Sequence, residues 1–134
     1  MRILHTGDWH IGKKLGRFDR TAEAEAVLGE VVAIADAEDV DAVLVAGDLF
    51  DRAVPPLPYL SLVLDKLGRL ASSGRRVVVI PGNHDSAELM RVLGPLLAGL
   101  NVFVVHKPLA PAAGGVVIVP ARDGSMSARV ACLH

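Results

Sequence analysis

Short, mostly apolar runs alternate along this chain with longer stretches of helically spaced apolar residues. The runs predict strands at residues 2–6, 42–46, 77–80 and 102–105, and the spaced stretches predict helices at 21–37, 57–71 and 86–98. The run at 42–46 is apolar at every position, which is typical of a strand buried on both faces of a parallel sheet. Two further β-like runs, at 116–119 and 128–133, flank the turn Arg122-Asp123-Gly124 and predict a hairpin. The pattern therefore predicts an α/β fold with mostly parallel strands and a C-terminal β-hairpin.

The predicted helices carry signals at their ends and on their faces. Asp19 or Thr21 is placed to cap the first helix, and Ser86 is placed to cap the third. Gly94 and Pro95 inside the third helix predict a kink or an early stop. The second helix has one apolar stripe and further leucines off that stripe: Leu60, Val63, Leu64 and Leu67, and then Leu57, Leu62 and Leu70. A helix that is apolar on more than one face needs more than one partner to pack against.

Polar side chains follow three successive strands, at the edge where parallel α/β sheets bind ligands. The three groups are Asp8 with His10, Asp48 with Asp51, and Asn83 with His84. We interpret Asp8-x-His10 as an extended segment, whose period of two points both side chains the same way. Asp48 offers two oxygens that can bridge two ions, and Asn83 adds a carbonyl oxygen. Oxygen and imidazole donors suit Mn²⁺, Mg²⁺, Fe or Zn²⁺ better than they suit Cu⁺ or an iron–sulfur cluster.

Two ions about 4 Å apart stabilise both the attacking and the leaving oxygens in phosphoester hydrolysis. His84, beside Asn83, is placed to contact the phosphate or to protonate the leaving group. Asp51 stays open between a metal contact and hydrogen bonding within its own loop. Cations in the same loops are candidate phosphate contacts, with a solvated charge as the alternative; they are Lys13, Lys14, Arg17 and Arg52.

The remaining candidates are interpreted as structural. His5 lies within the first strand, and we predict a core histidine there instead of a ligand. Trp9 is predicted to pack beside the site. His106 and His134 are late and isolated in the sequence, so neither is predicted to bind metal.

Composition narrows the class of protein without naming a reaction. The chain of 134 residues is long enough for one domain with a real core, which we place at residues 1–134. Apolar residues make up 51% and aromatic residues only 4%, so that core must be aliphatic. The formal net charge of −1 gives no support to nucleic-acid binding through bulk charge, which would need a local basic patch.

Nothing in the sequence points to an oxidising compartment or to a membrane. The single Cys132 has no partner for an internal disulfide, which fits a reducing compartment. No signal-peptide pattern is present at the start, and no apolar stretch approaches the roughly 20 residues that span a bilayer. We therefore expect a cytoplasmic protein without membrane contact.

The three polar motifs, in their context, resemble the metallophosphoesterase (calcineurin-like) superfamily. The stretches that carry the resemblance are His5-Thr6-Gly7-Asp8-Trp9-His10-Ile11-Gly12, Val45-Ala46-Gly47-Asp48-Leu49-Phe50-Asp51, Pro55-Pro56 and Gly82-Asn83-His84-Asp85. Within that superfamily they are similar to the nucleases of DNA double-strand-break repair, meaning the D subunit of the bacterial exonuclease and its archaeal and eukaryotic Mre-type relatives. Gly7 stands where that family's first motif is expected to have a serine.

The resemblance implies roles for individual residues. Asp8, His10 and Asp48 would bind the first of two Mn²⁺ ions, Asp48 and Asn83 would bind the second, and His84 would be the catalytic histidine near the scissile phosphate. It also implies DNA as the substrate, an SMC-like ATPase subunit as a partner, and a homodimer formed through the helices at 57–71 and 86–98. The implied location is the bacterial cytoplasm, in association with the nucleoid.

The same resemblance implies a fold that this chain does not complete. We expect the N-terminal part of a four-layer αββα sandwich, truncated before the downstream histidines, including a Gly-His-x-His motif, and before the DNA-capping region. We therefore expect weak activity or none from the fragment alone. Two alternatives stay open: another metallophosphoesterase, acting on a cyclic nucleotide, a nucleotide-sugar lipid or a phosphoprotein, and a non-catalytic dimerisation or partner-binding module.

Overall fold

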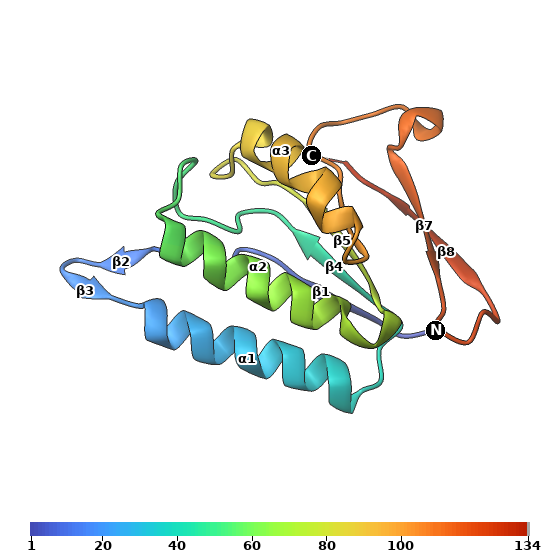
Figure 1. The fold of residues 1–134 in the computed structure, drawn as a ribbon, viewed down its shortest axis with the longest axis horizontal. Helices are drawn as coiled ribbons and strands as arrows, with labels where there is room; N and C mark the ends of the chain where they lie inside the picture. Colours follow the sequence, from blue (N-terminus) through green and yellow to red (C-terminus); the bar gives the residue numbers. More distant parts are fainter. Residues whose placement is uncertain (134) are drawn as a thin grey trace.

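A computed structural model describes residues 1–133 as a parallel sheet with helices and two antiparallel strand pairs (Figure 1). The sheet has the order β1-β4-β5-β6, and its strands are β1 (Ile3–Thr6), β4 (Ala42–Ala46), β5 (Arg76–Ile80) and β6 (Val102–Val104). The longer helices are α1 (Thr21–Ala37), α2 (Leu57–Ala71) and α3 (Ala87–Ala98), and the short 3₁₀ helices are η1 (Ser72–Gly74) and η2 (Pro111–Ala113). The antiparallel pairs are β2 (Lys14–Leu15) with β3 (Phe18–Asp19), and β7 (Val116–Pro120) with β8 (Ser127–Ala131). The predicted α/β fold with parallel strands and a C-terminal hairpin is confirmed; the β2–β3 pair was not predicted.

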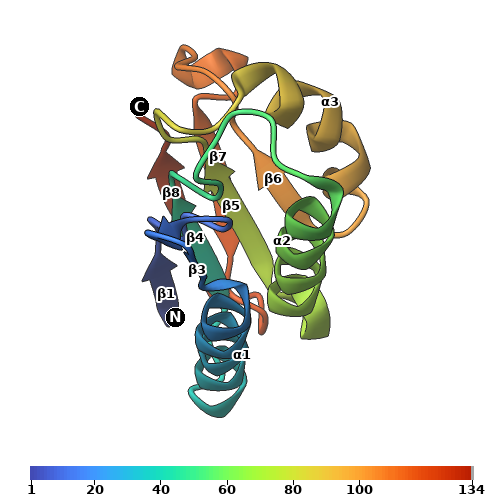
Figure 2. The same cartoon turned by 90° about the vertical axis from the view of Figure 1, so that its left-hand side faces the viewer.

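The parallel sheet lies between two layers, with the helices on one face and the β7–β8 hairpin on the other (Figure 2). Val43 and Val45 of β4 pack in the helical core, whereas Ala42 packs in the core beneath the hairpin. Successive strand residues point to opposite faces, so the all-apolar run at 42–46 serves both cores, as predicted. Each fully buried aliphatic side chain contributes about 1.5–3 kcal/mol to this packing.

Helix α3 begins at its predicted cap and runs past its proline. Ser86 Oγ accepts a hydrogen bond from Leu89 N at 3.1 Å. Gly94-Pro95 predicted a kink or an early stop; the early stop is wrong, because the helix continues to Ala98, and the kink stays a prediction. Pro95 has no N–H for the helical bond to the carbonyl of Arg91. Both residues are exposed, so water can take the place of that bond.

Neither predicted candidate is the N-cap of α1, which is Arg20, although Asp19 binds the first residue of the helix from one position earlier. Asp19 Oδ1 accepts hydrogen bonds from Thr21 N at 2.8 Å and from the Thr21 hydroxyl at 2.5 Å. These bonds from Thr21 hold the pKa of Asp19 below its ordinary value. The carboxylate therefore satisfies a backbone donor that the first turn of the helix leaves without a partner.

The buried side of α2 differs from the predicted stripe. Val63, Leu67 and Leu70 are each only 1% exposed, so Leu70 lies in the core although it was predicted to lie off the stripe. Leu57, in the first turn, is 78% exposed. The helix packs against both α1 and the sheet, and these are the two partners that its apolar faces require. Within residues 1–133, no helix is long and apolar enough to cross a membrane.

Candidate metal centre

Three loops meet at the carboxyl end of the parallel sheet, and we call the loops after β1, β4 and β5 the site loops. Backbone hydrogen bonds tie them together: Asp8 N donates to Gly47 O at 3.0 Å, His10 N to Asp48 O at 2.9 Å, and Gly47 N to Ile80 O at 2.9 Å. These bonds continue the strand pairing beyond the ends of the strands. The side chains of the site loops are therefore carried on a backbone whose register is fixed.

Three predicted ligands have a left-handed backbone. The φ angles are 53° at Asp8, 44° at His10 and 50° at Asp48. A residue with a side chain in this region carries strain of about 1–3 kcal/mol, which the surrounding structure must compensate. The interpretation of Asp8-x-His10 as an extended segment is wrong, because both residues turn the chain instead of continuing β1. Their side chains approach each other on this left-handed backbone, with His10 Nε2 3.6 Å from Asp8 Oδ1.

His10, Asp48 and His84 converge from the three site loops. Each offers one ligand atom, and these atoms lie within 4.8 Å of one another. His10 Nε2 is 3.6 Å from Asp8 Oδ1 and 3.7 Å from Asp48 Oδ2. The rings of His10 and His84 meet edge to face, with centroids 5.0 Å apart. The convergence predicted from strand order is therefore present in the structure.

The carboxylate of Asp48 is buried in surroundings that provide few partners. Asp48 is 8% exposed; its Oδ1 accepts a hydrogen bond from His84 N at 2.9 Å, and its Oδ2 faces His10 Nε2. In residues 1–133, neither Asp8 nor Asp48 forms an ion pair with a lysine or arginine. His10 Nδ1 is also buried without a hydrogen-bond partner. A buried carboxylate needs a compensating cation, so these donors fit a divalent ion.

His84 is oriented by the loop after β4. Its Nδ1 lies 3.0 Å from Asp51 O. A carbonyl oxygen only accepts hydrogen bonds, so we assign the proton to Nδ1. Nε2 is then the nitrogen that remains to bind a metal ion or to act on a phosphate.

Two glycines allow the site loops to approach each other closely. A Cβ on Gly82 would clash with Asp48 Oδ1 and would lie 2.5 Å from Asp48 N. A Cβ on Gly7 would lie 2.5 Å from Ala46 O, which gives a steric reason for glycine at the position where the resembling family is expected to have serine. A side chain at either position would force the loops apart.

Asp85 joins two of the site loops, and the sequence analysis assigned it no role. Its carboxylate accepts hydrogen bonds from Leu49 N at 3.1 Å, Phe50 N at 3.0 Å and Gly82 N at 3.0 Å. The bond to Gly82 spans three residues, a spacing at which an Asp side chain commonly bonds its own loop. The bonds to residues 49 and 50 depend on the neighbouring strand, so no local signal in the sequence announces them.

The other predicted site residues lie outside the His10–Asp48–His84 cluster. Asn83 is exposed in the loop after β5, and Arg52 is exposed in the loop after β4. Lys13, with Asp8 and His10, lines a cavity of about 370 Å³ beside α1. Arg17 lies in the turn of the projecting β2–β3 pair, with its guanidinium 5.9 Å from the Phe18 ring centroid (Figure 1).

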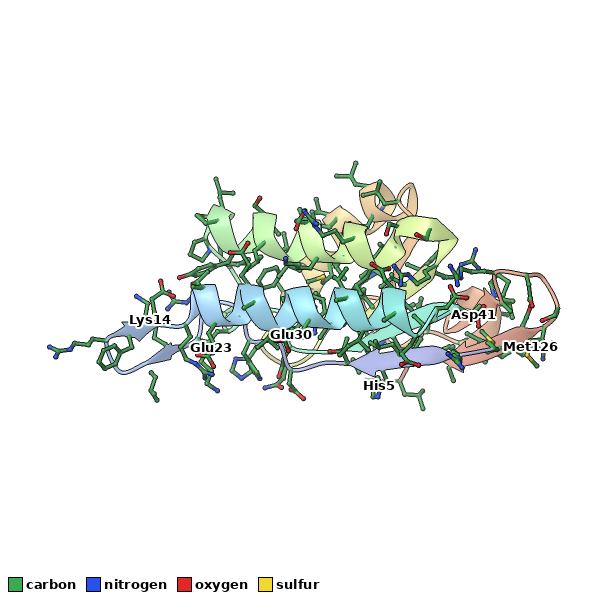
Figure 3. The ribbon with its side chains drawn as sticks, turned by 90° about the horizontal axis from the view of Figure 1, so that it is seen from below. His5, Lys14, Glu23, Glu30, Asp41 and Met126 are labelled. Carbon is green, nitrogen blue, oxygen red and sulfur yellow. The ribbon has the colours of Figure 1, made fainter. Side chains whose placement is uncertain are left out.

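Of the residues predicted to be structural, Trp9 packs as predicted, whereas His5 does not lie in the core. Trp9 packs against the helical core, and its Nε1 donates to Thr6 Oγ1 at 3.0 Å, as expected for a packing residue. The prediction that His5 lies in the core is wrong: β1 is an edge strand, and His5 is exposed on the side away from α1 (Figure 3). His106 is half-buried, and His134 lies outside the described residues.

A parallel α/β sheet with carboxylates and imidazoles at its carboxyl end is the framework of a metallophosphoesterase. The sequence matches the calcineurin-like phosphoesterase family over residues 1–134, and the chain belongs to that family. This confirms the resemblance stated from the motifs.

Its curated relatives are bacterial nuclease subunits. The chain is 39% identical over 128 residues to the D subunit of nuclease SbcCD from Escherichia coli K12, covering 96% of this chain and 31% of that protein. It is 36% identical over 138 residues to the protein of the same name from Bacillus subtilis, covering 97% of this chain and 35% of that protein. It is 38% identical over 141 residues to the protein of the same name from Rhodobacter capsulatus, covering 99% of this chain and 35% of that protein. The chain spans about a third of the length of these curated relatives.

Proposed function

We propose that this chain provides the metal-binding portion of a Mn²⁺-dependent nuclease that hydrolyses phosphodiester bonds at DNA ends in double-strand-break repair and recombination. The observation that carries the proposal is the convergence of His10, Asp48 and His84 from three loops. The similarity to the SbcCD nuclease subunits along almost the whole chain supports the substrate class.

The proposed metal ligands are those that the family resemblance implies. Asp8, His10 and Asp48 would hold the first ion, and Asp48 with Asn83 would hold the second. When bound, such ions stabilise the attacking and leaving oxygens of the phosphodiester. Oxygen and imidazole donors are compatible with Mn²⁺, and Mg²⁺, Fe and Zn²⁺ are the alternatives to test beside it.

His84 is proposed as the catalytic histidine. Its Nδ1 is engaged by Asp51 O, so Nε2 is the nitrogen that faces the scissile phosphate. With both nitrogens protonated, Nε2 donates a proton to the leaving oxygen, and the hydrogen bond from Nδ1 keeps the ring in place during the transfer. Asp51 acts in this scheme through its backbone carbonyl, and Lys13, Arg17 and Arg52 are proposed phosphate contacts.

The proposed assembly includes a second copy of the chain and an ATPase. The homodimer through α2 and α3 is the one that the resemblance implies, and exposed leucines on both helices, Leu57 at 78% and Leu96 at 72%, are available to it. The name of the SbcCD relatives denotes one part of a complex with a second type of subunit. For this protein we propose an SMC-like ATPase subunit and a place beside chromosomal DNA in the bacterial cytoplasm.

The exposed apolar surface on α2 and α3 also favours a second candidate, a non-catalytic dimerisation module. A chimera separates the two: this chain replaces the matching 35% of the Bacillus subtilis relative, which supplies the remaining length. We expect Mn²⁺-dependent degradation of linear duplex DNA, lost on Asp8→Ala.

The substrate panel for this chimera includes linear duplex DNA, bis-p-nitrophenyl phosphate and cyclic nucleotides. Hydrolysis of cyclic nucleotides without degradation of DNA would indicate another phosphoesterase activity. A chimera that dimerises but hydrolyses none of these substrates would indicate the non-catalytic module.

A further inference from the structure

The loops after β4 and β5 are joined by hydrogen bonds of two kinds. Residues 48–51 and 82–85 share four such bonds, and two of them use the Asp48 carboxylate or the His84 ring. Those two groups are needed for metal or phosphate in the proposed function. The other two bonds, from Leu49 N and Phe50 N, both end on the carboxylate of Asp85.

We propose that Asp85 is a positioning residue of the metal centre, which sets the spacing between Asp48 and His84 by holding their two loops together. The inference rests on the proposed function, because it gives Asp85 a role towards the metal ion assigned there. The hydrogen bonds that the Asp85 carboxylate accepts come from the backbone N–H groups of Leu49, Phe50 and Gly82, so Asp85 acts on the site through the backbone.

Two of the donors that Asp85 binds, Leu49 N and Phe50 N, belong to the residues that come immediately after Asp48. Asp48 has a left-handed backbone, with a φ of 50°. On its other side the same segment is paired with Ile11: Ile11 N donates to Leu49 O at 3.0 Å, and Asp51 N donates to Ile11 O at 3.1 Å. The loop after β4 is therefore held on one side by the β1 loop and on the other by Asp85. Because Leu49 and Phe50 are each only 1% exposed, water cannot simply replace the carboxylate.

Holding this segment fixes two atoms of the site at once. Asp48 Oδ1 accepts from His84 N, and Asp51 O accepts from His84 Nδ1, so the conformation of residues 48–51 decides where both groups point. If the Asp85 carboxylate is removed, three backbone donors lose their acceptor and the segment must rearrange. The expected consequence is a site whose ligands are present but less well preorganised for the ion.

The test uses the 134-residue chain, Mn²⁺ as the probe, and a matched control at the other end of the sheet. Asp41 is also a carboxylate that joins two segments through backbone N–H groups, from Arg2 N at 2.7 Å and Arg122 N at 2.9 Å. Mn²⁺ affinity is measured by electron paramagnetic resonance titration, and amide hydrogen exchange is followed at Leu49 and Phe50. Asp85→Ala removes all the bonds, whereas Asp85→Asn keeps one acceptor oxygen and remains useful if Asp85→Ala does not fold.

We expect Asp85→Ala to weaken Mn²⁺ binding about 10–100-fold, the usual effect of losing an outer partner of a metal site. We expect faster exchange at Leu49 and Phe50, an intermediate effect for Asp85→Asn, and unchanged Mn²⁺ affinity for Asp41→Ala. Folded Asp85 variants with wild-type affinity and wild-type exchange would overturn the positioning role, as would an equal loss of affinity in Asp41→Ala.

The metal role and the proposed function fail in distinguishable ways. If the wild-type chain binds no Mn²⁺, the metal ligation in the proposed function is overturned, and the metal role of Asp85 with it. Amide exchange then still decides whether Asp85 fixes the loop. If the wild-type chain binds Mn²⁺ and folded Asp85 variants bind it equally well, only the inference about Asp85 is overturned.

Discussion

The two ends of the parallel sheet use acidic residues in opposite ways. At the amino end the carboxylates are matched by arginines, in the ion pairs Arg2–Glu38, Arg75–Asp36 and Arg122–Asp39. At the carboxyl end, the one ion-pair partner that Asp8 and Asp48 have within residues 1–133 is the His10 imidazole, whose Nε2 lies at 3.6 and 3.7 Å from them. Figure 3 shows Asp41 beside the β7–β8 turn at one end of the molecule, marked by Met126, with Lys14 at the other.

The surroundings of a carboxylate, more than its presence, therefore mark the functional end of the sheet. A left-handed backbone alone does not distinguish the functional end of the sheet from the other end, because Asp39 at the amino end has a φ of 49°. Asp39 follows the last turn of α1, where Val40 N donates to Ala35 O, and a left-handed residue is the common way to end a helix. At the carboxyl end the same conformation occurs in residues whose carboxylates and imidazole converge without a matching cation.

The largest expected effect separates His84 from a histidine at the edge of the sheet. In the chimera, His84→Gln should lower the rate of bis-p-nitrophenyl phosphate hydrolysis about 10²–10⁴-fold, the usual contribution of a general acid. Mn²⁺ affinity of the chain should stay close to the wild-type value. His5→Gln, at the exposed edge strand, is the control and should change neither quantity. An equal loss of affinity and rate in His84→Gln would make His84 a metal ligand instead.

The next effect compares one carboxylate from each end. Asp48→Asn keeps an acceptor for His84 N but removes the charge, and Mn²⁺ affinity should fall by about 100-fold or more. Asp41→Asn removes a charge that the backbone N–H groups of Arg2 and Arg122 already satisfy, so Mn²⁺ affinity should not change. Titration calorimetry checks both variants. Similar losses from the two ends would remove the distinction drawn between them.

A pair of glycines tests the close approach of the site loops. Gly82→Ala places a Cβ against Asp48 and should destabilise the chain by about 1–3 kcal/mol, as overpacking of a fixed site does. Gly68→Ala, in α2, meets nothing within 4 Å and should stabilise the helix by about 0.5–1 kcal/mol. The free energy of unfolding measured in urea should therefore fall for Gly82→Ala and rise for Gly68→Ala. Equal behaviour would show that the loops have room to separate.

The smallest effect is a dependence of stability on pH that comes from the amino end. Hydrogen bonds from Arg122 N and Arg2 N hold the pKa of Asp41 below its ordinary value of 3.8. A lowered pKa in the folded state stabilises the protein above pH 3.8, and that contribution is lost as the pH falls through the folded-state pKa. Thermal unfolding between about pH 5 and pH 2 should thus show a smaller acid-induced loss in Asp41→Asn than in the wild type. Parallel profiles would assign the acid sensitivity to other carboxylates.

Much of the fold could be predicted from sequence because the signals are local. The all-apolar run at 42–46 and the cap at Ser86 are properties of neighbouring residues, and both are confirmed. The placement of His5 failed, since β1 lies at an edge of the sheet and strand order is not a local property. The prediction that α3 stops at Pro95 was wrong, because the free-energy cost of the missing N–H depends on whether water can reach the unpaired carbonyl.

The candidate site divides in the same way. The meeting of His10, Asp48 and His84 follows from the rule that parallel strands end at one edge of a sheet. The left-handed turns at Asp8 and His10 and the bonds to Asp85 arise from contacts between distant loops. Sequence could therefore predict that residues from the three loops meet, and only the structure gives the backbone on which His10, Asp48 and His84 do so.

The most direct test of the account is anomalous diffraction from crystals of the chain grown with Mn²⁺. We expect an anomalous peak within coordination distance of His10 Nε2 and Asp48 Oδ2, at the carboxyl end of the sheet, and no peak among Asp39, Asp41 and Asp123 at the amino end. A peak at the amino end, or crystals in which Mn²⁺ leaves the carboxyl end empty, would contradict it.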